Sequence, residues 1–125
     1  MQIDFSNLDL DLTLLNEIAD GSDEFIVESI DMFLQQAPTS LQDIANGFEK
    51  SDWQTAGAAA HKLKATLGFF GMLNSQALLN QIELSCKTGS PDAEEVTAKL
   101  AQANAFITAS SAALLKVKEE TAANL

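Results

Sequence analysis

The chain contains one histidine, His61, within the stretch Ala60-His61-Lys62-Leu63-Lys64. Imidazole has a large neutral fraction near pH 7 and is nucleophilic, so it can accept a phosphoryl group and pass it on. A cation one helical turn away would offset the charge of that group, and Lys64 has this spacing. These residue types favour phosphoryl transfer, with His61 as acceptor and Lys64 in charge stabilisation. The alternative interpretation of His61 is an ordinary surface histidine, and that of Lys64 is a solubilising surface charge.

The residues around His61 predict an amphipathic helix. Ala56, Ala60, Leu63 and Leu67 are spaced 4, 3 and 4, which places them on one apolar face. At 100° per residue His61 lies about 160° from Leu63, so it points away from the core. The surface around it is nearly free of bulky side chains and is the predicted partner-binding surface: Gly57, Ala58, Lys62, Ala65 and Gly68.

A second polar group is expected to hold the imidazole in one tautomer. If the following helix runs antiparallel after a turn near residues 69–70, position 61 lies roughly opposite position 79. The polar residues near that point are Gln76, Asn80 and Glu83. Any of the three is a candidate, and a plain solvated acid is the alternative for Glu83.

The histidine stretch resembles the motif of the histidine phosphotransfer (HPt) domain, roughly Ala-His-x-Leu-Lys-Gly with a further glycine some ten residues past the histidine. This chain has Ala60-His61-Lys62-Leu63-Lys64 and Gly71, and it departs from the motif at Ala65. The order of helices is similar across nearly the whole chain. The resemblance implies that Glu83, 22 positions after His61, contacts and orients the imidazole.

By this resemblance, His61 accepts a phosphoryl group from a phospho-aspartyl receiver domain and passes it to another response regulator. The implied partners are receiver domains and a hybrid sensor kinase. Magnesium is expected on the receiver, and no cofactor or metal on this chain. The protein would be a phosphocarrier in a two-component phosphorelay and not an enzyme. The alternative is a helical adaptor that binds receivers or other proteins without phosphotransfer.

The fold class expected from the apolar periodicity is all-α, an antiparallel four-helix bundle with a short extra N-terminal helix. One domain is expected over residues 1–125, with an N-terminal capping arm at 1–10 and a frayed tail at 121–125. The helices are predicted at 11–20, 22–48, 52–68, 73–87 and 91–119.

Several local signals refine these boundaries. Ser51 and Gln54 fit a capping box, and Ser90 is the expected N-cap before Pro91 in the first helical position. Pro38 either kinks or divides the helix that contains it. An exposed apolar patch near Leu12, Leu15 or residues 69–70 would serve either the phosphocarrier or the adaptor. Ile18 is expected on the same side of the first helix as Leu12 and Leu15.

Composition restricts the partners. The net charge is −11 with no arginine, which argues against nucleic acid and against an anionic membrane surface. No apolar run reaches ~20 residues, and no signal peptide is visible at the start.

Cys86 is the one cysteine, which fits a reducing cytoplasm and a small core or boundary residue. A monomer is expected. The sequence has no phosphate-binding loop and no zinc ligand set.

Overall fold

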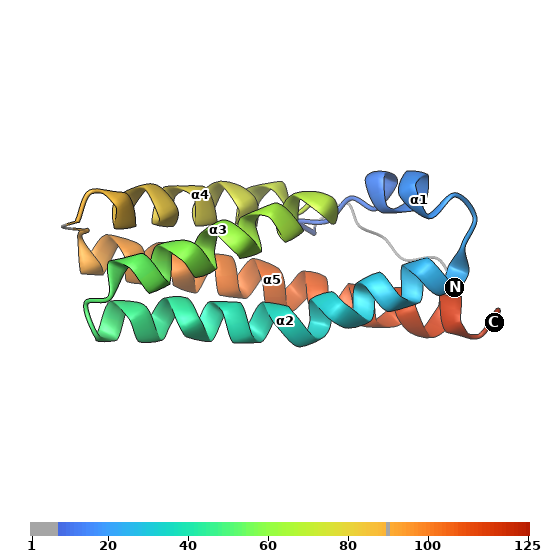
Figure 1. Cartoon of the computed structure of the whole chain (residues 1–125). Coiled ribbons are helices and arrows are strands. Elements are labelled where there is room, and N and C mark those ends of the chain that lie inside the picture. Colours follow the sequence, from blue (N-terminus) through green and yellow to red (C-terminus); the bar gives the residue numbers. More distant parts are fainter. Residues whose placement is uncertain (1–7, 90) are drawn as a thin grey trace.

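The computed structural model describes residues 8–89 and 91–125, and these residues form helices and connecting turns without strands. The expected all-α bundle with a short extra helix at its N-terminal end is confirmed. Each of the four long helices runs antiparallel to the next one along the chain, and the short first helix lies at one end of the bundle (Figure 1). The bounds are α1 Thr13–Ala19, α2 Asp23–Glu49, α3 Trp53–Phe69, α4 Leu73–Lys87 and α5 Ala93–Ala122.

The four long helices form a closed arrangement in which each packs on two neighbours. Helix α2 contacts α3 and α5, and α4 contacts the same two helices. The apolar positions of each helix meet in one core, where Phe33 and Phe70 have ring centroids 4.9 Å apart. In α5 the polar Ser110 is buried among the apolar positions and donates a hydrogen bond to the backbone oxygen of Asp9 at 2.9 Å.

Helix α2 continues through Pro38 without division. Its axis changes direction where its colour passes from cyan to teal in Figure 1. Pro38 removes one backbone donor and crowds the preceding turn, which bends a helix without ending it when the apolar face continues on both sides. Here Phe33 and Ala37 before the proline and Ile44 after it are all buried, so packing holds the two halves together.

The N-cap residues predicted for α3 and α5 are both wrong. Asp52, not Ser51, caps α3 by accepting a hydrogen bond from Thr55 N at 3.1 Å. Ser51 has φ +55° and closes α2 instead, because its N–H bonds to Phe48 O while Asp52 N bonds to Gly47 O.

Helix α5 begins two residues later than predicted. Asp92 is its N-cap, accepting from Glu94 N and Glu95 N, so Pro91 precedes the helix. The expected cap Ser90 lies outside the described residues. At its other end α5 continues through Ala122, two residues into the expected frayed tail.

The described part of the N-terminal arm holds the turn between α3 and α4. The N-cap residue of α4, Met72, makes no capping bond of its own. The buried Asp9 carboxylate supplies one by accepting from Asn74 N and Ser75 N, each at 2.8 Å, and from the Ser75 hydroxyl at 2.6 Å. The remainder of the expected arm, residues 1–7, lies outside the described residues.

Gly71 is required by this same arm. It has φ +65°, and a Cβ there would overlap the backbone of Asp11. The Asp11 N–H bonds to Phe70 O at 3.1 Å, which brings the two segments this close.

Leu12, Leu15 and residues 69–70 do not form the exposed apolar patch that would serve a phosphocarrier or an adaptor. Leu12, Leu15 and Phe70 are buried in the core, and Phe69 is partly buried against it. Ile18, expected on the same side of the helix as Leu12 and Leu15, is 51% exposed. Helix α1 has only seven residues and packs chiefly on α2, so its core-facing stripe is narrower than the spacing suggested.

We predict that Asp9→Ala lowers the free energy of unfolding by about 2 kcal/mol, because it removes a charged cap and leaves buried N–H donors of α4 unpaired. Urea unfolding followed by circular dichroism measures this. Asp43→Ala removes the same charge from an exposed helical position, and we expect it to change stability by less than about 0.5 kcal/mol. Equal losses in the two variants would contradict the capping role.

Candidate functional site

His61 lies on α3 with its side chain 69% exposed. The opposite face of the helix is buried against the bundle through Ala56, Ala60, Leu63 and Leu67. The imidazole therefore faces away from the core, as the spacing of the apolar residues predicted. A group carried by another protein has open access to it.

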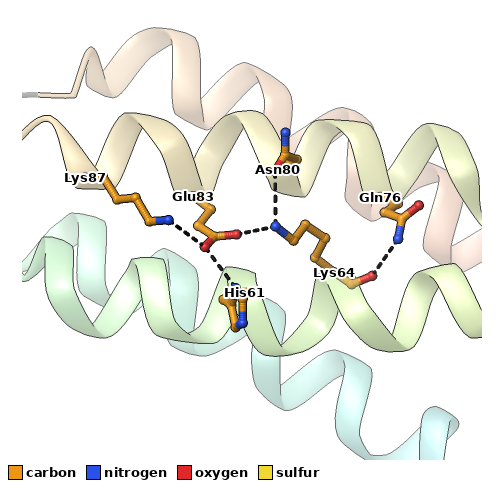
Figure 2. A network of polar contacts seen from close by, with 6 residues as sticks. All are labelled: His61, Lys64, Gln76, Asn80, Glu83 and Lys87. Atoms are coloured by element: carbon orange, nitrogen blue, oxygen red, sulfur yellow. Dashed lines mark hydrogen bonds and ion pairs between the residues drawn. The ribbon is translucent and has the colours of Figure 1, made fainter.

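The antiparallel pairing of α3 and α4 places Glu83 beside the imidazole. His61 Nδ1 lies 2.9 Å from Glu83 Oε2, and the Glu83 side chain is only 6% exposed (Figure 2). Of the three polar candidates on α4, Glu83 is the one that contacts the ring. The Asn80 side chain accepts a hydrogen bond from Lys64 Nζ at 3.1 Å, and the Gln76 amide donates one to the backbone oxygen of Lys64 at 3.3 Å.

Glu83 also pairs with two lysines. Lys64 Nζ lies 2.7 Å from Oε1, and Lys87 Nζ lies 3.3 Å from Oε2. Lys64 is 25% exposed and paired, unlike the solubilising surface lysine that was the alternative for it. Lys87 was not selected from the sequence, although Glu83 and Lys87 are spaced i and i+4, a spacing that brings opposite charges together on a helix.

The lysines fix the protonation state of the carboxyl group. The Lys64 ammonium lowers the pKa of Glu83 from 4.5 to about 2 against the opposing effect of burial, with His61 and Lys87 adding to the decrease. An ionised carboxylate can only accept hydrogen bonds, so Nδ1 of a neutral His61 must carry the proton. This leaves Nε2 with a free lone pair in the exposed part of the site.

The small residues around His61 have two structural roles. Ala58 and Ala65 are exposed and leave the approach to the ring open. Gly57 and Gly68 lie at the contact between α3 and α4, where a Cβ on Gly57 would be 3.1 Å from Cys86 Cβ and one on Gly68 would overlap the Gln76 amide. Gly57 therefore allows the close helix packing that brings Glu83 to the imidazole, whereas at Gly68 the flexible Gln76 side chain could move aside.

Grooves adjoin the site on both sides. A groove of about 460 Å³ beside His61 is lined by residues of α3 and α4 that include Trp53, Gln54 and Cys86. The thiol of Cys86 is buried, which raises its pKa, so it is a poor nucleophile at neutral pH. On the other side the exposed Lys62 lines a polar groove between α2 and α3.

Two other features are absent from the described ranges, a metal-binding group and a membrane-spanning helix. Residues 8–89 and 91–125 contain no group of three or more histidine, cysteine or acidic side chains placed to hold a metal ion. Within the same ranges, no helix combines the length and the apolar character needed to cross a membrane.

Comparison with known proteins agrees with the geometry. The family model described as Hpt domain matches residues 28–116, which include all of α3 and α4 and most of α2 and α5. No curated protein and no solved structure gives a significant match. The chain belongs to the Hpt domain family, whose members carry phosphoryl groups on histidine in phosphorelays and are not kinases.

The lowered pKa of Glu83 predicts a dependence of stability on pH. The folded-state value of about 2 is below the ordinary value of 4.5, so Glu83 stabilises the fold fully above about pH 4.5. That contribution is lost as the pH falls toward 2. We expect Glu83→Gln to lower the free energy of unfolding by about 1–3 kcal/mol at pH 7, and the difference from wild type to shrink steadily below pH 4.5.

Urea unfolding at pH 7, 5, 4 and 3 measures this difference. Glu28→Gln is the control, because Glu28 is exposed on α2 and its neutralisation should change stability by less than about 0.5 kcal/mol throughout. A wild-type advantage over Glu83→Gln that stays constant from pH 7 to pH 3 would show that the charge of Glu83 is not what stabilises the fold.

Proposed function

We propose that His61 accepts a phosphoryl group from the aspartyl phosphate of a receiver domain and passes it to another response regulator. The observation that carries this proposal is the exposed imidazole whose Nδ1 is bound by the ionised, buried Glu83. This contact selects the tautomer with a nucleophilic Nε2 and keeps the ring in one orientation. An ordinary surface histidine needs neither feature.

The proposed step is a direct displacement at phosphorus. The Nε2 lone pair forms a bond to phosphorus while the bond from phosphorus to the aspartyl oxygen breaks, and the aspartate leaves as a carboxylate with the electron pair. Nδ1 keeps its proton, so positive charge develops on the ring during the step. The Glu83 carboxylate 2.9 Å away stabilises that charge, and the reverse step restores the neutral imidazole.

Lys64 has a complementary role. Its ammonium is held on the His61 side of α4 by Glu83 Oε1 and Asn80 Oδ1. A cation fixed one turn from the acceptor offsets negative charge on the moving phosphoryl group without first having to be ordered.

The receiver is proposed to dock on the small residues and grooves around His61. Gly57, Ala58, Ala65 and Gly68 present little bulk, and Lys62 adds an exposed positive charge to the rim. Magnesium and its acidic ligands are assigned to the receiver. A hybrid sensor kinase as donor, a monomeric state and a cytoplasmic location remain predictions.

The adaptor alternative finds no specific support in the described residues. The apolar positions that would have served it are mostly in the core. An adaptor also has no use for an ionised carboxylate bound to an exposed imidazole. The two functions differ in outcome, because an adaptor binds a receiver and acquires no phosphate.

We predict that His61→Gln abolishes phosphoryl acceptance from a phosphorylated receiver and leaves the fold intact, since the side chain faces solvent. Radiolabelled transfer measures acceptance, and the product on the wild type should be acid-labile and base-stable. Circular dichroism and a receiver-binding titration are the controls. Full labelling of the variant would identify another residue as the nucleophile, whereas binding by the wild type without any labelling would favour the adaptor.

Lys64→Ala should slow transfer by roughly 10- to 100-fold, because it removes the cation fixed beside the acceptor. Receiver affinity should fall less than the rate, since the interaction strengthens as the phosphoryl group arrives. Stability should fall by about 1 kcal/mol, because Glu83 Oε1 loses its partner. Rapid-quench kinetics beside a binding titration measure the two effects.

Lys64→Arg and Asn80→Ala are the matched variants for this experiment. The arginine keeps the charge, and Asn80→Ala removes a contact of Lys64 while its ammonium stays. Both should transfer faster than Lys64→Ala. Equal rates for wild type and Lys64→Ala would reduce Lys64 to a structural partner of Glu83.

A further inference from the structure

Lys87 is one of two lysines that contact the Glu83 carboxylate, and it is held differently from Lys64. Its ammonium lies 3.3 Å from Glu83 Oε2, the same oxygen that contacts His61 Nδ1. The side chain is 67% exposed and lines the groove beside His61. The ammonium of Lys64 lies closer to Glu83, at 2.7 Å from Oε1, and also contacts Asn80. The Lys64 side chain is only 25% exposed. Lys64 is therefore fixed, whereas Lys87 is a hydrated charge on a flexible stem that can turn toward a new anion nearby.

Phosphorylation changes the net charge of this cluster. With His61 neutral, two ammonium groups face one carboxylate, so the cluster has one positive charge in excess. Transfer of a phosphoryl group adds one negative charge, which the excess cancels. Without Lys87 the cluster would begin neutral and end with an unbalanced negative charge. The other lysine near the ring, Lys62, lines the groove between α2 and α3 and makes none of the contacts with Glu83.

We propose that Lys87 is the second cation that stabilises phosphorylated His61, and that it sets how the phosphoryl group partitions between this protein and its receiver. The proposal rests on the proposed function of His61. Lys64 acts mainly while the group moves, because it is already in place. Lys87 acts on the finished phosphohistidine, because it turns from Glu83 to the phosphoryl oxygens once they are present.

The size of the effect follows from Coulomb attraction near a protein surface. An exposed ammonium a few ångströms from the phosphoryl oxygens should shift the equilibrium by a factor of roughly 3 to 10 at moderate salt. The shift should fade at high salt, because the Debye length falls from about 10 Å at 0.1 M to about 3 Å at 1 M.

The test uses the full chain as wild type, Lys87→Met, Lys87→Arg and Lys99→Met. Methionine keeps much of the length without the charge, and arginine keeps the charge. Lys99 is the matched control, because it also pairs with a glutamate four residues earlier on its helix, Glu95, away from the site. Transfer from a phosphorylated receiver is followed to equilibrium at 0.1 M and 1 M salt.

We expect Lys87→Met to move the equilibrium 3- to 10-fold toward the phosphorylated receiver at 0.1 M salt and less than twofold at 1 M. Lys87→Arg and Lys99→Met should stay within about twofold of wild type. Equal partition for wild type and Lys87→Met would overturn the proposal, as would an equal shift in Lys99→Met. A shift that is independent of salt would indicate a structural effect and would also overturn it.

A second arm separates this proposal from the function on which it rests. Phosphoramidate phosphorylates imidazole directly and releases ammonia, so it needs no receiver. At fixed phosphoramidate and ammonium concentrations, the equilibrium labelling ratio at His61 should be 3- to 10-fold lower for Lys87→Met than for wild type. If receivers fail to label the wild type, the proposed function fails, while this ratio still decides the role of Lys87. An unchanged ratio would overturn that role.

Discussion

The ionised carboxylate of Glu83 is the interaction on which the site depends. Burying a carboxylate between two helices is costly unless cations and donors surround it. Here the imidazole of His61 and the ammonium groups of Lys64 and Lys87 all contact its two oxygens (Figure 2). The same contacts that keep Glu83 charged orient the imidazole and gather positive charge beside it. Stability of the α3–α4 pair and reactivity of the histidine therefore have one physical source.

The alignment of α3 and α4 must be maintained for these contacts to form. A shift of one residue along either helix would rotate Glu83 away from His61 by about 100°. The turn that sets this alignment is held from outside, by the Asp9 cap on α4 and by the backbone bond from Asp11 to Phe70. The N-terminal arm thus contributes to the geometry of a site that it does not touch.

Charge is distributed unevenly in this acidic chain. Lys62, Lys64 and Lys87 lie around the one imidazole, although the whole sequence has only seven basic residues. The site is consequently a local exception to the negative surface, and the phosphoryl group proposed to reach His61 would meet positive charge there. Gly57 beside the imidazole completes this arrangement by letting α3 and α4 approach closely.

The sequence alone determined the helical fold, the helix order and the exposure of His61, because apolar spacing along one helix fixes which face is buried. It also reduced the partner of the imidazole to three residues of α4. Caps were less predictable, since Ser51 and Asp52 both suit an N-cap and only the closing turn of α2 assigns their roles. Tertiary structure decided three contacts: Glu83 with the imidazole, Lys64 with Glu83, and Lys87 with Glu83. Each depends on the distance and rotation between two packed helices, which no spacing within a single helix specifies.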